Sequence, residues 1–164
     1  MTVSVSRSTP LLIGALSTIG PLGIDMYLPS IPTMAQSLNT TEGSVQLSLM
    51  TYFFGLMLGQ LFYGPLSDKF GRKPMIRLGL IIFIFGSIGC ALVENVFQLH
   101  IMRLIQGFGG SIGMVIAFAM IKDLYQGPMM GKMMSMVLAI LGLSPVLAPL
   151  IGNGLQSLDS WRAI

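Results

Sequence analysis

Five long runs of apolar residues, separated by short polar segments, constrain this chain more than any other feature of its sequence. They cover approximately residues 11–28, 45–66, 75–93, 97–121 and 133–158. A helix needs about 20 apolar residues to cross the hydrocarbon core of a bilayer, and each run is close to that length or longer. We therefore expect an all-α membrane protein with five transmembrane helices, and we treat residues 1–164 as one domain.

The composition supports this expectation. Of the 164 residues, 53% are hydrophobic and 9% are charged, whereas about 25% of the residues of a soluble domain are charged. The net charge is +3, but the basic residues are spread over loops, so we expect the lipid bilayer and no nucleic acid as a partner. Cys90 is the single cysteine, which leaves no intrachain disulfide.

The most strongly charged segment is GPLSDKFGRKP, residues 64–74. It places Arg72 and Lys73 in a short hairpin between two apolar runs, and cationic loops beside a span stay on the cytoplasmic side. With Arg7 ahead of the first run, this pattern predicts a cytoplasmic N-terminus. An odd number of spans then leaves Asp159 outside.

Each special residue of this hairpin has an expected role. Gly64 is expected to let the preceding helix approach a neighbour closely, and Asp68 lies where that helix ends. Gly71 permits a turn, and Pro74 suits the first turn of the next helix.

Two ionisable residues, Asp25 and Arg103, lie within the apolar runs. A charge inside the membrane is costly and therefore marks a functional site by default. We expect both residues within about 10 Å of the outer boundary, from the rise of 1.5 Å per residue and a core of about 30 Å. They could face one another or a common cavity. The alternative is that both side chains reach the outer interface.

Small and polar residues recur at helical spacing on four of the runs. The stripes are Gly14, Thr18, Pro21 and Asp25; Tyr52, Gly55, Gly59 and Tyr63; Arg103, Gln106, Gly107, Gly110 and Met114; and Gly142, Pro145, Pro149 and Gly152. Such stripes favour close helix packing or a border with water, and the residues alone leave both readings open. The two prolines bend the fifth helix, either as part of a moving interface or as a static kink.

The charged hairpin closely resembles the loop between the second and third spans of the major facilitator superfamily of transporters. RLIQGFGG, residues 103–110, resembles the fourth-span motif of that superfamily, and the fifth run resembles the Gly/Pro motif of its drug antiporters. IDMYLPSIP, SPVLAP and SWRAI are similar to the bicyclomycin/chloramphenicol resistance subfamily of drug:proton antiporters.

The resemblance implies twelve spans in two six-span halves, with substrate bound near the midplane between them. This chain matches the first five spans, so we expect an incomplete six-helix N-terminal half that looks truncated. The missing C-terminal half is then an expected partner.

The resemblance also implies roles for named residues. The proton and substrate set is Asp25, Arg103, Gln106, Tyr27 and Tyr52. The gating loop comprises Gly64, Asp68, Gly71, Arg72 and Lys73. The bending helix carries Gly142, Pro145, Pro149 and Gly152.

The expected function is export of small lipophilic, drug-like compounds in exchange for protons across the bacterial cytoplasmic (inner) membrane. The proton gradient would supply the energy, with no cofactor and no metal. Two alternatives stay open, namely a proton-coupled uptake symporter of the same superfamily and a truncated membrane fragment without transport activity.

An enzyme is not expected, although GGSIG, Gly109 to Gly113, matches the G-x-S-x-G pattern of a nucleophile elbow. That elbow needs a strand, a turn and a helix, whereas Ser111 lies inside a predicted helical span. The single histidine, His100, lies eleven residues earlier, about 16 Å along the helix axis, so it cannot activate Ser111.

Overall fold

The computed structural model describes residues 9–158 and 160–163. Residues 1–8, 159 and 164, which include Arg7 and Asp159, lie outside the described part. Within that part every regular element is helical: α1 Thr9–Asp25, η1 Leu28–Ser30, α2 Ile31–Ser37, α3 Glu42–Phe70, α4 Arg72–Leu92, α5 Val96–Leu124, α6 Gly127–Leu158 and η2 Trp161–Ala163.

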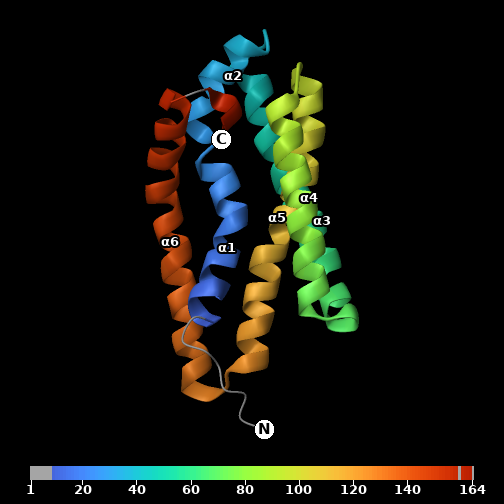
Figure 1. Cartoon of the computed structure of the whole chain (residues 1–164), viewed down its shortest axis with the longest axis vertical. Coiled ribbons are helices and arrows are strands. Elements are labelled where there is room, and N and C mark those ends of the chain that lie inside the picture. Colours follow the sequence, from blue (N-terminus) through green and yellow to red (C-terminus); the bar gives the residue numbers. More distant parts are fainter. Residues whose placement is uncertain (1–8, 159, 164) are drawn as a thin grey trace.

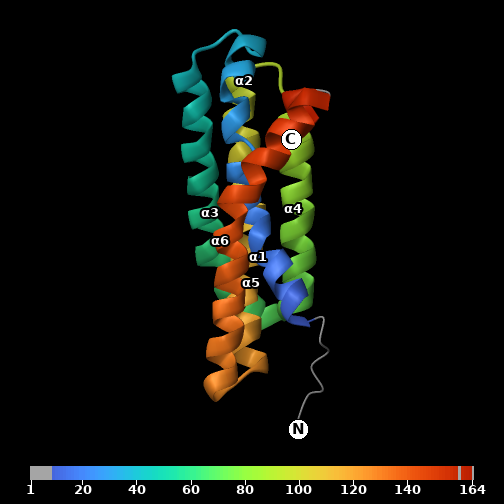
Figure 2. The same cartoon turned by 90° about the vertical axis from the view of Figure 1, so that its left-hand side faces the viewer.

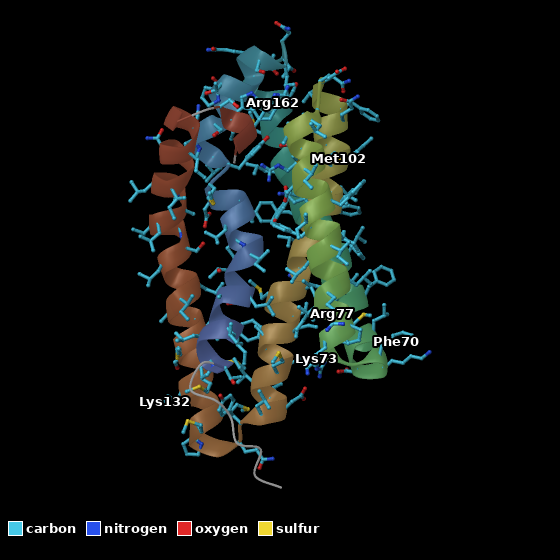
Figure 3. All side chains as sticks on the ribbon, in the orientation of Figure 1. Phe70, Lys73, Arg77, Met102, Lys132 and Arg162 are labelled. Carbon is cyan, nitrogen blue, oxygen red and sulfur yellow. The ribbon has the colours of Figure 1, made fainter. Side chains whose placement is uncertain are left out.

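Five helical segments are long and apolar enough to cross a membrane, as the hydropathy predicts. They run along the long axis of the molecule (Figure 1 and Figure 2). The start of α1, the turn between α3 and α4 and the turn between α5 and α6 lie at one end of the bundle. Lys73 and Lys132 lie toward that same end (Figure 3). A cytoplasmic location for this end stays a prediction from the positive-inside rule.

The first span is interrupted, which the sequence reading missed. Helix α1 ends at Asp25, and the same membrane-length segment continues through η1 and α2 to Ser37. Pro29 has no N–H to bond the Asp25 carbonyl four residues earlier, and the residue before a proline disfavours helical backbone. Asp25 therefore lies at a helix break within this segment, twelve residues before its end at Ser37.

The charged hairpin is shorter than predicted. Helix α3 continues to Phe70 and α4 begins at Arg72, so Gly71 alone connects them. Gly71 has a φ of 91°, a left-handed conformation that glycine adopts without steric cost. Because lysine and arginine are good helix formers, both helices extend beyond their apolar parts into the charged segment.

Helix α5 forms the centre of the bundle, with α3 and α4 packed along it and α1 beside it (Figure 1). Glycines permit this packing: a Cβ on Gly55 would meet the Leu104 carbonyl, and a Cβ on Gly107 would meet the Tyr52 carbonyl. The predicted α3 stripe is confirmed as a packing face, since Tyr52, Gly55, Gly59 and Tyr63 are all buried.

The prediction for Gly64 is wrong. Apart from its chain neighbours and the backbone of its own helix, no described atom lies within 4 Å of the place where its Cβ would be, so this glycine brings no other helix close. Its carbonyl instead accepts a 2.9 Å hydrogen bond from the hydroxyl of Ser67, one turn later in α3.

Candidate functional site

The backbone carbonyls in the last turn of α1 accept hydrogen bonds from different kinds of donor. The Leu22 carbonyl accepts from the Met26 N–H and the Ile24 carbonyl from the Tyr27 N–H, each at 3.1 Å. The Gly23 carbonyl receives Nη1 of Arg103 at 2.8 Å. A cation is favourable at this position because the C-terminal end of a helix carries partial negative charge.

The side chain of Arg103 is buried, with 5% of the residue exposed, and several neighbouring groups contact it. Its Nη1 also donates to Oε1 of Gln106 at 2.9 Å, and Gln106 donates in turn to the Ser87 hydroxyl at 2.8 Å. The guanidinium lies 3.6 Å from the ring centre of Tyr27 and 5.7 Å from that of Tyr52. Hydrogen bonds and cation–π contacts thus compensate the buried charge, which fixes α5 against α1 and α4.

Asp25 lines a different space, a cavity of about 400 Å³. This cavity lies between α1, α3, α5 and α6, and its walls are mostly apolar. The lining residues are Gly20, Pro21, Ile24, Asp25, Phe53, Leu56, Gln60, Gly110, Ser111, Met114, Leu141 and Pro145. Asp25 is the one titratable side chain among them, so the cavity combines an apolar wall with a single acid.

Asp25 and Arg103 do not line a common cavity in this structure. Arg103 and Gln106 line a separate space of about 220 Å³ between α1, α4 and α5. Within residues 9–158 and 160–163, no ion pair joins Arg103 to Asp25. The helix break turns the Gly23 carbonyl toward Arg103, and the arginine bonds this carbonyl in place of the carboxylate two residues later.

Tyr27 and Tyr52 are too buried to contact a substrate in this conformation. Both side chains are 0% exposed. The Tyr27 hydroxyl lies 2.6 Å from that of Ser48, and the Tyr52 hydroxyl donates to the Gly20 carbonyl at 2.9 Å. In this conformation neither ring faces the Asp25 cavity, and both instead support the helices around it.

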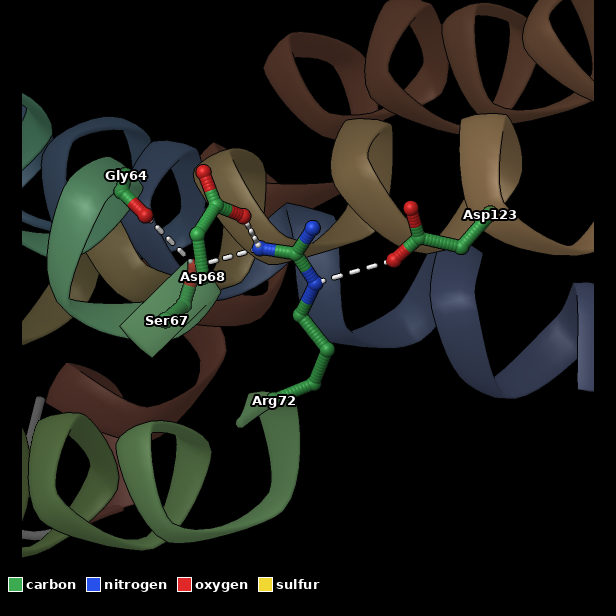
Figure 4. A network of polar contacts seen from close by, with 5 residues as sticks. All are labelled: Gly64, Ser67, Asp68, Arg72 and Asp123. Carbon is green, nitrogen blue, oxygen red and sulfur yellow. Dashed lines mark hydrogen bonds and ion pairs between the residues drawn. The ribbon is translucent and has the colours of Figure 1, made fainter. Parts of the chain in front are cut away.

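A charge network occupies the turn between α3 and α4 (Figure 4). Nη1 of Arg72 lies 2.6 Å from Oδ1 of Asp68, and Nε of Arg72 donates to Oδ2 of Asp123 at 3.0 Å. Nη1 also donates to the Ser67 hydroxyl at 2.5 Å. The network therefore ties the end of α3 and the start of α4 to the end of α5.

The network has a simple electrostatic reason. Arg72 lies at the N-terminal end of α4 and Asp68 near the C-terminal end of α3, and each charge alone is unfavourable beside its own helix dipole. Pairing them removes both penalties. Asp123, the third member, was missed by the sequence reading. Its position in the sequence could have indicated this role, because Asp123 is an acidic residue at the end of the fourth apolar run. That end is expected on the same side of the membrane as Arg72.

A family model described as the Major Facilitator Superfamily matches residues 13–164. The chain belongs to this superfamily. The match and the five membrane-length helices establish a multi-pass protein of the bacterial cytoplasmic membrane.

Relatives within the superfamily carry names linked to drug resistance. A bicyclomycin resistance protein homolog of Haemophilus influenzae is 36% identical over 94% of this chain and 39% of the relative. A chloramphenicol resistance protein of Pseudomonas aeruginosa is 35% identical over 96% of this chain and 38% of the relative. An uncharacterized MFS-type transporter of Bacillus subtilis, YdgK, is 38% identical over 93% of this chain and 39% of the relative.

The chain spans about 39% of the length of the curated relatives that it matches. The matched region corresponds to the helices described above. The resemblance to the bicyclomycin/chloramphenicol resistance subfamily, inferred from short motifs, is thereby confirmed.

The face of α6 that packs against the other helices differs from the stripe predicted for the fifth span. Gly142 has no neighbour within 4 Å of its Cβ position and is exposed. A Cβ on Gly152 would meet the Met26 carbonyl, and Pro145 lines the Asp25 cavity. The buried face of α6 is instead Val137, Ser144, Ala148 and Gly152. Three of these residues, Val137, Ser144 and Ala148, were missed because they do not differ from ordinary packing residues in the sequence.

Ser111 lies inside α5, as predicted, and its hydroxyl donates to the Phe108 carbonyl at 2.8 Å. The G-x-S-x-G pattern is therefore helix sequence and forms no nucleophile elbow. The same serine lines the Asp25 cavity together with Gln60. Gln60 was also missed, although an isolated amide side chain in an apolar run could have indicated a residue that faces a cavity.

Proposed function

We propose that this chain is part of a transporter that exports small lipophilic compounds in exchange for protons, with Asp25 as the group that exchanges them. The observation that carries the proposal is the apolar cavity of about 400 Å³ with one titratable side chain in its wall. Relatives named for bicyclomycin and chloramphenicol resistance support it.

The cavity suits the proposed substrates by size and chemistry. Pockets for drug-sized ligands usually measure about 300–1,000 Å³ and are mostly apolar with a few polar groups. Phe53, Leu56, Met114 and Leu141 give this wall aromatic, aliphatic and thioether surface. Such side chains repack around varied shapes, which favours a broad range of lipophilic or weakly cationic compounds.

The position of Asp25 supports proton exchange. A carboxylate in an apolar site inside the membrane is costly unless a cation or a proton neutralises it. Arg103 is not that cation, because it lines a different cavity and no ion pair joins it to Asp25 among the described residues. A proton and a cationic or polar substrate can then compete for Asp25, which couples the entry of one to the release of the other.

The Arg72 network supports a gate at the end of the bundle that the basic loops place in the cytoplasm. Alternating access in this superfamily requires two halves that rock around the substrate site. Contacts of Arg72 with Asp68 and Asp123 join three helices into one unit at the proposed gate. Lys73 and Gly71 flank that unit, and their part in gating stays a prediction.

The first experiment is to read the coding DNA beyond the Ile164 codon and to express the full reading frame. In that protein we expect Asp25→Asn to abolish drug resistance and drug-dependent proton movement while the membrane level stays normal. Glu94→Gln, at an exposed acid outside the cavity, serves as the matched control. Normal resistance from Asp25→Asn, with the control also normal, would contradict the coupling role.

The alternatives give different results. An uptake symporter accumulates its substrate when an inward proton gradient is imposed on vesicles, whereas an exporter excludes it from cells. A fragment without activity gives no proton-dependent movement of substrate in either direction, and Asp25→Asn changes nothing.

A further inference from the structure

Ser144 on α6 differs from most of the buried serines that the structure describes. Four of the other five donate their hydroxyl to the carbonyl three residues earlier in the same helix; they are Ser17, Ser48, Ser67 and Ser111. This is the usual habit of a serine inside a helix. The fifth, Ser30, donates to Oε1 of Gln156 on α6. Ser144 is 4% exposed, and its hydroxyl is directed instead at Oδ2 of Asp25 on α1, at 3.4 Å.

Ser144 also has a possible acceptor nearby in its own helix. Pro145 has no N–H to donate to the Leu141 carbonyl, four residues earlier. Leu141 is also three residues before Ser144, the position to which those four serines donate. The Ser144 hydroxyl thus has two acceptors within reach by side-chain rotation, the Asp25 carboxylate and the Leu141 carbonyl.

We propose that Ser144 positions the Asp25 carboxylate for proton exchange, donating to it when it is charged and turning to the Leu141 carbonyl when it is protonated. The inference rests on the proposed function of Asp25. At 3.4 Å the contact is long for an O–H···O bond, and a charged acceptor shortens and strengthens such a bond. Ser144 keeps its own proton throughout, and the proton taken up by Asp25 comes from water in the cavity.

The other charged and titratable groups around Asp25 are engaged elsewhere or distant. On α5, Arg103 bonds Gly23 and Gln106. On α3, Tyr52 donates to the Gly20 carbonyl. The one charged residue of α6 is Lys132, twelve positions before Ser144 and so about 18 Å along the helix. Among the described residues, the Ser144 hydroxyl is the side-chain donor within hydrogen-bond reach of the Asp25 carboxylate.

The test is an infrared titration of the protonated carboxyl band in the purified full-length protein. Asp25→Asn should remove the titrating band and so identify it. Ser144→Ala removes a donor to the charged form, so the band should titrate about one pH unit higher, a roughly tenfold gain in proton affinity. Ser144→Thr keeps the hydroxyl and should restore the original midpoint, and Ser144→Cys, a weaker donor, should give a smaller upward shift.

Ser17→Ala is the matched control, because it also removes a buried hydroxyl but one that bonds its own helix. It should leave the midpoint in place. If Asp25→Asn leaves the titrating band unchanged, the proposed function of Asp25 fails. If the band is lost in Asp25→Asn but does not move upward in Ser144→Ala, or if Ser17→Ala moves it equally, the role of Ser144 alone is wrong.

Discussion

Helices α5 and α6 are both rich in glycine, yet their glycines serve different purposes. In α5 a Cβ on Gly107 or Gly109 would collide with the backbone of α3 or α4. In α6 a Cβ on Gly142 would meet nothing within 4 Å, and Gly152 alone of the two glycines in the predicted stripe touches a neighbour. The first helix is the packed centre of the bundle, and the second rests mainly against α1.

The difference shows what a glycine pattern can and cannot predict. Small residues at helical spacing allow close contact, but contact forms only where a neighbouring helix lies on that face. Helix α5 has neighbours on several sides, so its glycines are used. Helix α6 presents Leu143, Val146 and Leu150 outward with Gly142, on a face without a described neighbour in this chain.

One substitution, glycine to alanine, tests the comparison at three positions. The largest effect is expected for Gly107→Ala, because the added methyl group would meet the carbonyl of Tyr52, which is backbone and cannot rotate away. We expect a loss of about 3 kcal/mol in unfolding free energy, at the upper end of the range for overpacking. Thermal unfolding in detergent micelles measures it, and an unchanged midpoint would show that α3 and α5 separate easily.

Gly152→Ala should have an intermediate effect. Its methyl group would also meet backbone, the carbonyl of Met26. Because α6 packs mainly on α1 and the contact is near its end, the helix can shift, and we expect a loss of about 1 kcal/mol. A loss as large as that of Gly107→Ala in the same assay would mean that α6 is held as firmly as α5.

Gly142→Ala should have the smallest effect and the opposite sign. Alanine is favoured over glycine inside a helix by about 0.5–1 kcal/mol, and no atom opposes its methyl group here. A slightly raised unfolding midpoint is expected. A clear loss of drug export in the full-length protein, with folding intact, would instead support the predicted bending role of Gly142.

The candidate site was predictable in its residues but not in its arrangement. Asp25 and Arg103 stand out as charges inside apolar runs, and Arg72 and Asp68 stand out in the charged turn. The helix break after Asp25 separates the first two into different cavities, and the path of α5 brings Asp123 to Arg72. Both outcomes depend on residues from segments far apart in the chain, which local patterns do not encode.

The sequence by itself determined the five membrane-length helices, because a bilayer forces each apolar run to satisfy its backbone hydrogen bonds internally. It also determined which residues share a helical face, since the helix period is fixed. Only the tertiary structure decided which face meets which neighbour. A rotation of α6 by about one residue position, roughly 100°, would turn Ser144 away from Asp25. Packing against the other helices sets that rotation.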